Sequence, residues 1–191
     1  MKEAPGYIKS FRLSSLSRVK PWGLSGKRVI DIALAGFGIV LLSPLLLLCF
    51  AACRLSSPGP ALFGHPRIGF QGKYFRCLKF RTMVINGEEV LREYLASHPE
   101  ANAEWEATGK LRVDPRVTAM GSILRKAGLD EIPQLFNVLR GEMSIVGPRP
   151  VTEEELARYS TSVGSYLACR PGITGALLTE SNNVHATSWW A

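Results

Sequence analysis

Residues 39–48 read Ile39-Val40-Leu41-Leu42-Ser43-Pro44-Leu45-Leu46-Leu47-Leu48 and form the centre of a 22-residue segment without charge, which extends from Ile32 to Cys53. A helix of about 20 apolar residues matches the thickness of the hydrocarbon core of a bilayer. A buried helix of a soluble protein explains the segment less well, because a domain of this size rarely needs a helix that is apolar on every side. The sequence therefore predicts a membrane-embedded helix over residues 32–53.

Basic residues flank this apolar segment on both sides. They are Arg18, Lys20, Lys27 and Arg28 before it, and Arg54, Arg67 and Lys73 after it. Lys and Arg are retained on the cytoplasmic side of a membrane, so a straight spanning helix would carry one of the two clusters across. A re-entrant helix would keep both clusters on the same side.

The middle of the apolar segment contains residues that can bend a helix. Pro44 has no N–H to donate to the carbonyl of Val40, and the Ser43 hydroxyl can turn back to the carbonyl of Ile39 or Val40. Transmembrane helices also tolerate proline. The residues alone therefore leave two topologies open, namely a re-entrant helix broken at Ser43 and Pro44, and a kinked spanning anchor.

Charge is distributed unevenly along the chain of 191 residues, whose net charge is +7. Up to Arg81 there are 13 basic and two acidic residues, whereas the remainder has 10 basic and 14 acidic residues. Hydrophobic residues make up 46% of the chain, which excludes wholesale disorder, and the length suits one compact domain. The basic part predicts an anionic partner. The run from Lys73 to Arg81 carries no recognised nucleic-acid motif, so we expect anionic lipid head groups and no nucleic acid.

The pattern along the chain predicts an α+β fold that is mainly helical: a re-entrant membrane helix followed by a small cytoplasmic α/β catalytic domain. We divide the chain into a basic N-terminal segment (1–31), the membrane-embedded helix (32–53), the cytoplasmic domain (54–175) and a tail (176–191). Within the domain we expect short strands or a hairpin at 61–83 as the one β region, an acidic helical region at 86–108 interrupted by Pro99, a helix at 118–128, and a helix from Asp130 to Gly141 with Pro133 in its first turn.

Two adjacent carboxylates, Asp130 and Glu131, stand at the predicted start of that last helix. Capping of exposed N–H groups is an ordinary explanation for acids at such a position. Arg125 precedes the pair and Arg149 follows on a turn fixed by two prolines, which is a composition suited to phosphate. A carboxylate in a phosphate site indicates either a bridging metal ion or a carboxylate that attacks phosphorus. Both alternatives imply phosphoryl transfer.

The block from Leu129 to Pro150, which reads LDEIPQLFNVLRGEMSIVGPRP, resembles the signature of bacterial sugar transferases, the monotopic phosphoglycosyl transferases that initiate polysaccharide assembly. The chain looks most similar to their exopolysaccharide-initiating members in rhizobia. The Ser43-Pro44 pair also matches, and in the family it breaks a re-entrant helix. Further matches are Arg67-Ile68-Gly69, Lys79-Phe80-Arg81-Thr82-Met83, Asp114-Pro115-Arg116-Val117-Thr118, Leu124-Arg125-Lys126 and Arg170-Pro171-Gly172-Ile173-Thr174-Gly175.

This resemblance implies a role for each candidate residue. Asp130 would attack the β-phosphate of a UDP-hexose and expel UMP, and a polyprenyl (undecaprenyl) phosphate would then take the hexose phosphate. Glu131 would help to hold Mg²⁺. Phosphate-binding positions match Arg125, Arg149, Lys79 and Arg81. The expected location is the bacterial inner membrane with the domain facing the cytoplasm, and other proteins of polysaccharide assembly are expected as further partners.

The sequence departs from the family pattern after Gly175. The residues Ala176 to Ala191 lack the Trp-Gln pair and the Ser-Gly-Arg that the family carries there, so we expect a truncated or frame-altered tail. Ala127-Gly128 also replaces the small hydroxyl pair that usually precedes the two acids. An alternative function is therefore an inactive or regulatory membrane protein that modulates exopolysaccharide production.

Overall fold

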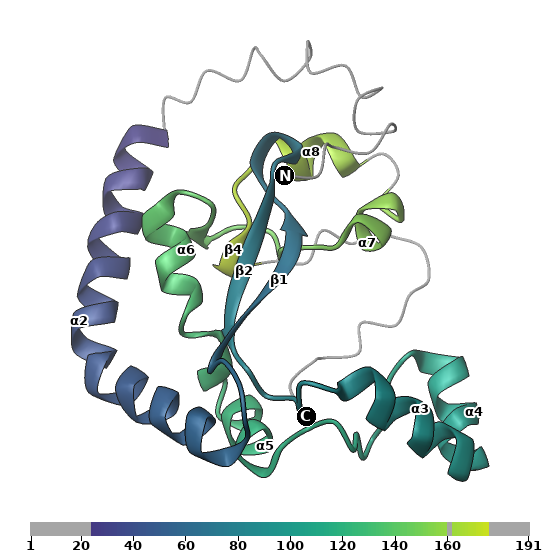
Figure 1. Cartoon of the computed structure of the whole chain (residues 1–191). Coiled ribbons are helices and arrows are strands. Elements are labelled where there is room, and N and C mark those ends of the chain that lie inside the picture. The colour runs from purple at the N-terminus through teal and green to yellow at the C-terminus, as the bar shows by residue number, and fades with distance from the viewer. Residues whose placement is uncertain (1–23, 160–161, 176–191) are drawn as a thin grey trace. The chain divides into compact units, whose positions relative to one another are not determined.

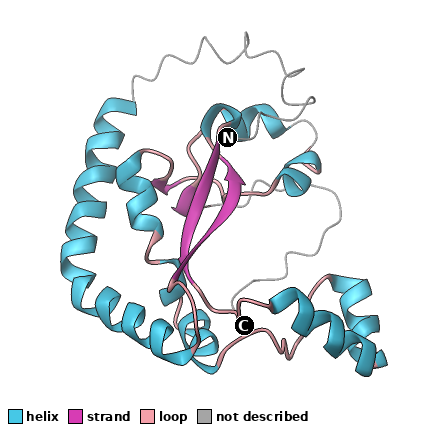
Figure 2. Cartoon of the chain, viewed as in Figure 1, coloured by secondary structure: helices cyan, strands magenta, loops and turns pink. Residues whose placement is uncertain are grey.

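A computed structural model describes residues 24–159 and 162–175, so the predictions for most of the basic segment 1–31 and for the tail 176–191 lie outside the described residues. The described part is mainly helical with four short strands, as the α+β prediction expected (Figures 1 and 2). Its elements are α2 (Leu24–Ser56), β1 (Leu62–Ile68), η2 (Phe70–Gly72), β2 (Tyr74–Phe80), α3 (Gly87–Ser97), α4 (Pro99–Thr108), α5 (Ala119–Lys126), η3 (Leu129–Glu131), α6 (Gln134–Arg140), β3 (Ser144–Val146), α7 (Glu153–Ala157), α8 (Val163–Leu167) and β4 (Gly172–Thr174).

The long helix α2 contains the whole predicted apolar segment and extends beyond it at both ends. It is long and apolar enough to cross a membrane. The Ser43 hydroxyl donates to the Val40 carbonyl at 2.8 Å, as predicted, and Pro44 lies inside a helix that continues to Ser56. Large apolar side chains are exposed along its length, including Phe37 (67% exposed), Val40 (74%) and Leu47 (70%). Exposed apolar surface of this extent marks an interaction with lipid or with another apolar partner.

The described residues group into two compact units, and the boundary divides α2 after Pro44. The first unit contains residues 24–44, 64–79 and those described from Pro133 onward. Its strands β1 and β2 are hydrogen-bonded neighbours joined by a five-residue turn, which fits only an antiparallel hairpin. The predicted hairpin at 61–83 is therefore confirmed.

A second pair of strands in the first unit was not predicted. Strands β3 and β4 run parallel, with Ser144 opposite Gly172 and Val146 opposite Thr174. The expectation of a single β region was wrong, because strands of three residues are too short to show an alternating pattern. Gly147 follows β3, and a Cβ atom there would lie 2.3 Å from the Arg170 carbonyl oxygen, so only glycine permits this close approach of the two backbones.

Helix α6 begins later than predicted and buries a different face. Its first residue is Gln134, and Gly141 closes it in the left-handed conformation, with φ of 83°. The sequence places apolar residues at helical spacing at Ile132, Leu135, Phe136 and Leu139 and so predicts that this stripe is buried. The buried residues are instead Gln134, Asn137 and Val138, whereas Phe136 (37% exposed) and Leu139 (39%) remain exposed. The reason is Asn137, whose side chain hydrogen-bonds to the backbone of β2. Its Oδ1 accepts from the Leu78 N–H at 2.9 Å, and its Nδ2 donates to the Arg76 carbonyl at 2.7 Å.

The second unit contains residues 45–63 and 80–132. Its core is formed by the buried side chains of Cys49, Cys53, Ala61, Phe80 and Leu124. Helices α3 and α4 separate at Pro99, as predicted for the acidic region. The C-terminal half of α2 thus packs against segments that follow it in the chain.

Candidate phosphoryl-transfer site

The two adjacent carboxylates lie on a tight turn between helices and not in the first turn of α6. Helix α5 ends at Lys126, Gly128 adopts a left-handed conformation with φ of 66°, and the 3-10 turn η3 then carries Asp130 and Glu131. The predicted position at the start of the next helix is corrected, because that helix begins at Gln134. Both carboxylates are half-buried. Neither residue is the N-cap of η3 or α6, where Gly128 and Pro133 stand.

Arg125 lies in the last turn of α5, in the same unit as the carboxylates. Its Nε donates to the hydroxyl of Thr82 at 2.8 Å, and Thr82 is only 7% exposed. Thr118 caps the N-terminus of α5, and its backbone N–H donates to the Thr82 carbonyl at 3.0 Å. Bonding through Nε fixes the plane of the guanidinium and leaves its two terminal nitrogens for an oxyanion.

A second arginine in this unit, Arg116, holds Asp114 through two bonds, Nε to Oδ1 at 2.8 Å and Nη2 to Oδ2 at 2.6 Å. Burial raises the pKa of the Asp114 carboxyl, but the bonds from Arg116 and the charges of Arg116 and Arg125 lower it below its usual value overall. The Arg125 guanidinium is therefore close enough to Asp114 to act on it electrostatically.

Arg81 and Lys79 are placed differently from Arg125. The Arg81 guanidinium donates to backbone carbonyls of Ser57, Pro58 and Gly59, so it fixes the turn that follows α2. Lys79 lies near the end of β2 and belongs to the first unit. Binding of phosphate by either residue stays a prediction.

Arg149 belongs to the first unit, three residues after β3 ends. Its positive charge lies close enough to influence the Glu155 carboxylate electrostatically. That carboxylate accepts a hydrogen bond from Arg67 Nη1 at 2.7 Å. Burial raises the pKa of the Glu155 carboxyl, but the Thr152 N–H and the charges of Arg67 and Arg149 lower it below its usual value overall. Two guanidinium groups therefore gather near one carboxylate in this unit.

The predicted phosphate-binding and carboxylate residues are thus distributed over the two units. Asp130, Glu131, Arg125 and Arg81 are in the second unit, whereas Lys79 and Arg149 are in the first. In the described ranges, no group of three or more His, Cys, Asp or Glu residues could hold a metal ion. Mg²⁺ is usually bound through one or two carboxylates together with substrate phosphates and water, so its binding at Glu131 stays a prediction.

Comparison with known proteins identifies the family. A family model described as bacterial sugar transferase matches residues 22–189, which is most of the chain and continues past Gly175. The chain belongs to the bacterial sugar transferase family. The resemblance seen in the signature block from Leu129 to Pro150 is therefore confirmed.

Curated relatives of this sugar transferase carry related names. The exopolysaccharide production protein ExoY of Sinorhizobium fredii is 52% identical over 165 residues, which cover 86% of this chain and 73% of the relative. The undecaprenyl-phosphate galactose phosphotransferase of Salmonella typhimurium is 47% identical, over 86% of this chain and 36% of the relative. The UDP-glucose:undecaprenyl-phosphate glucose-1-phosphate transferase of Caulobacter vibrioides is 45% identical, over 78% and 51%. The chain thus spans between about a third and three quarters of these relatives.

Some residues of this sugar transferase were not singled out from the sequence. Thr82, which orients Arg125, and Arg67, which binds Glu155, both lie in motifs that match the family, and that match was the available signal. Asp31 carried no such signal in the sequence. Its role depends on Ser144, which is 113 positions away in the chain.

Proposed function

We propose that this protein transfers hexose-1-phosphate from a UDP-hexose to polyprenyl phosphate, as the first step in the assembly of an exopolysaccharide repeat unit. Membership of the bacterial sugar transferase family supports the reaction class. The names of the relatives from Salmonella and Caulobacter support a lipid-phosphate acceptor, and the name of the rhizobial relative supports the pathway. Because these relatives include a galactose and a glucose enzyme, the proposal extends to the class of hexose donor only.

The observation that carries this proposal is the turn after α5. The left-handed Gly128 places two carboxylates directly after a helix whose last turn carries Arg125 and Lys126. A diphosphate bound at these cations brings its phosphorus near a carboxylate, and the positive charge offsets the repulsion between the two anions. The same turn keeps the carboxylates half-buried, which reduces competition from water.

The reaction would proceed in two displacements at one phosphorus atom. In the first, a carboxylate oxygen of Asp130 bonds to the β-phosphorus of UDP-hexose, and the bond to the bridging oxygen breaks, so that UMP leaves with the electron pair. In the second, an oxygen of polyprenyl phosphate bonds to the same phosphorus, and Asp130 leaves as a carboxylate. Arg125 and Arg149 would bind phosphate oxygens as charge develops, and Lys79 and Arg81 are secondary candidates.

Glu131 would hold Mg²⁺ beside the nucleophile. When bound, the ion would neutralise charge on the diphosphate. Two adjacent carboxylates of one turn can serve different tasks, because consecutive residues direct their side chains differently. We assign nucleophilic attack to Asp130 and metal binding to Glu131 on the basis of their match to the family motif.

We also propose that α2 is re-entrant and that the domain faces the cytoplasm at the inner membrane. Lys27 and Asp31, near the start of α2, bind Ser144 and its neighbours, while Cys49 and Cys53, near its end, pack on Ala61, Phe80 and Leu124. No other helix in the described ranges is long and apolar enough to cross a membrane. The segments that receive the two ends of α2 are therefore expected on one side of the bilayer, which a spanning helix would not allow.

The test is release of UMP from UDP-glucose and UDP-galactose by membranes that contain the full chain, polyprenyl phosphate and Mg²⁺. Asp130→Asn should abolish release, because an amide does not displace UMP. Glu89→Gln is the control, since it also converts a carboxylate of the same unit to an amide but at an exposed position on α3, and it should retain activity. Undiminished turnover of Asp130→Asn would refute the nucleophile, and a wild type that releases no UMP from any UDP-hexose would refute the proposed function.

A further inference from the structure

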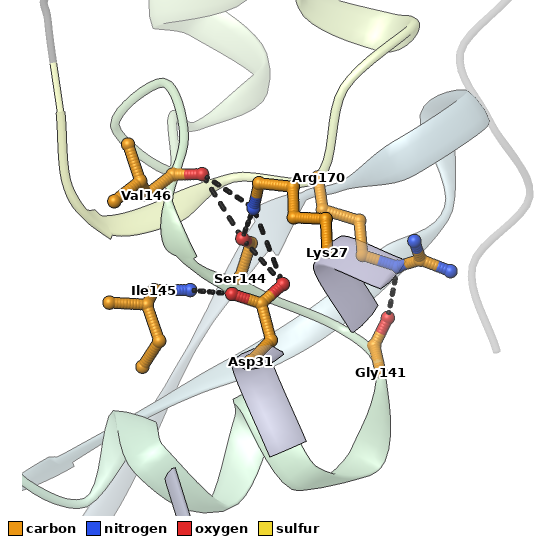
Figure 3. A network of polar contacts seen from close by, with 7 residues as sticks. All are labelled: Lys27, Asp31, Gly141, Ser144, Ile145, Val146 and Arg170. Carbon is orange, nitrogen blue, oxygen red and sulfur yellow. Dashed lines mark hydrogen bonds and ion pairs between the residues drawn. The ribbon is translucent and has the colours of Figure 1, made fainter. Parts of the chain in front are cut away.

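A network of polar contacts joins the first turns of α2 to β3 (Figure 3). The Asp31 carboxylate accepts a hydrogen bond from the Ser144 hydroxyl at 2.8 Å and another from the Ile145 N–H at 3.1 Å. Lys27 lies 3.3 Å from the same carboxylate, contacts the Ser144 hydroxyl and donates to the Val146 carbonyl at 3.1 Å. All three residues of β3 are thus bound by side chains from the membrane helix.

Strand β3 is held both by a neighbouring strand and by side chains of α2. On one edge it pairs with β4, and the pairing continues beyond the strand, with the Gly147 N–H donating to the Thr174 carbonyl at 3.0 Å. Asp31 and Lys27 add further bonds, to the Ile145 N–H and the Val146 carbonyl. Side chains of α2 thus supply hydrogen-bond partners to backbone groups of β3.

The same end of α2 also holds the end of α6. Arg28 Nη2 donates to the Leu139 carbonyl at 3.0 Å, and Arg170 Nε donates to the Gly141 carbonyl at 2.9 Å. These carbonyls belong to the C-terminal end of α6, where backbone acceptors lack partners inside the helix. Figure 3 shows the Arg170 contact beside the Asp31 network, so α2, β3 and the segment before β4 meet in one region of the first unit.

Asp31 is an unusual residue to find on this helix. It is 5% exposed and is the one acid in α2. Its carboxylate accepts hydrogen bonds from Ser144 and Ile145 and lies within ion-pair distance of Lys27. A buried anion with this many donors fixes geometry strongly, because each donor would be left without a partner if the carboxylate moved.

The strand that Asp31 holds leads directly into the turn Gly147-Pro148-Arg149. We infer that Asp31 is a positioning residue: through Ser144 and Ile145 it sets the place of the Arg149 guanidinium relative to the membrane-embedded helix. This inference rests on the proposed function, in which Arg149 binds phosphate. A helix held in lipid would thereby fix the depth at which Arg149 meets a substrate phosphate at the membrane surface.

Two variants test the inference in the full chain in native membranes. Asp31→Asn keeps the acceptor for the Ile145 N–H but places an NH₂ group against Lys27, and Ser144→Ala removes one donor with little change in volume. The matched control is Ser165→Ala, an exposed serine on α8 of the same unit. Asp31→Asn should lower kcat/KM for UMP release about tenfold, Ser144→Ala less, and Ser165→Ala by less than about twofold, because a displacement of about 1 Å is costly for a phosphate contact.

The decisive comparison repeats Asp31→Asn in an Arg149→Ala background. If Asp31 acts by placing Arg149, it has no guanidinium to position in the Arg149→Ala background. Adding Asp31→Asn to that background should then lower kcat/KM by less than about a further twofold. A purely structural role would lower activity by the same factor in both backgrounds, and that result would overturn the inference. An unchanged kcat/KM of Asp31→Asn in the wild-type background would also overturn it.

Hydrogen exchange provides a readout that does not depend on activity. Asp31→Asn and Ser144→Ala should each speed exchange in a peptide covering residues 143–150 and leave a peptide covering 163–168 unchanged. Exchange that matches the wild type at 143–150 would contradict the inference even if the wild type released no UMP. Failure of the wild-type assay alone would count against the proposed function and not against the positioning role.

Discussion

Gly121 in α5 lies so close to the backbone of Thr82 that its replacement by alanine should displace the helix that carries Arg125. A Cβ atom at Gly121 would lie 2.1 Å from the Thr82 carbonyl oxygen and 2.7 Å from the Thr82 Cα. An ordinary contact of this kind is at least 3.4 Å, so one of the two segments must move by more than about 1 Å. Arg125 is four residues further along α5 and stands on the same face, so the displacement would reach its bond to Thr82.

The size of the effect follows from two opposing contributions to the free energy of unfolding. Overpacking costs about 1–3 kcal/mol, and contact with rigid backbone places Gly121→Ala near about 3 kcal/mol. The helix propensity of alanine returns about 1 kcal/mol, which leaves a net loss of about 2 kcal/mol. For a chain of this length, that loss lowers the apparent Tm by about 4–8 °C. The displaced Arg125 should lower kcat/KM about tenfold or more.

Gly26→Ala is the matched control for this prediction. Gly26 is also a helical glycine, but nothing lies within 4 Å of a Cβ atom at that position. Alanine there should raise the free energy of unfolding by about 0.5–1 kcal/mol and leave activity unchanged. The assay is an apparent Tm in one detergent, together with UMP release in membranes, for the wild type and both variants. If Gly121→Ala matched Gly26→Ala in both measurements, the close packing of α5 on Thr82 would be refuted.

Two further predictions concern membrane topology and alkaline stability. Cysteines introduced at positions 20 and 73 should both resist an impermeant thiol reagent in intact cells if α2 is re-entrant, and labelling of either one would favour a spanning anchor. Tyr166 is fully buried, donates to the Ile68 carbonyl at 2.7 Å, accepts from the Val151 N–H at 3.2 Å, and has its pKa raised to about 12, chiefly by burial. The neutral Tyr166 hydroxyl therefore contributes about 3 kcal/mol to the free energy of unfolding below pH 10, and this contribution is lost as the pH rises towards 12. Tyr166→Phe should be less stable than the wild type at pH 8 but should lose less stability between pH 10 and 12. Equal losses of stability in the two proteins over that range would contradict the assignment.

The long apolar helix and the hairpin could be predicted because their signals are local. The apolar segment from Ile32 to Cys53 needs no partner to be recognised, and the bond from Ser43 to the Val40 carbonyl joins residues of one helical turn. The alternating apolar residues of β1 and β2 are adjacent in the chain and are joined by a short turn. Such features depend on periodicity and on contacts between near neighbours, which a single sequence displays.

The candidate site was predicted in composition but not in geometry. Asp130 and Glu131 were expected in the first turn of a helix, whereas Gly128 and Pro133 isolate them on a separate 3-10 turn. Helix boundaries of this kind depend on the packing of the flanking helices and are the least certain part of a prediction from sequence. Thr82, which orients Arg125, is 43 positions distant from it, and no periodic pattern relates the two residues.

The sequence by itself determined that this chain carries a helix long and apolar enough to cross a membrane, a basic region around it, and two carboxylates close in sequence to arginines within a family signature. Only the tertiary structure decided how the buried polar groups pair. Asp31 stands in a hydrophobic helix without a visible reason until Ser144 and Ile145 are brought against it, and Asn137 lies off the predicted apolar stripe yet is buried because it binds the backbone of β2. Burial of apolar surface is non-directional and leaves a pattern along the chain, whereas a hydrogen bond requires specific atoms that can come from any distance in the sequence.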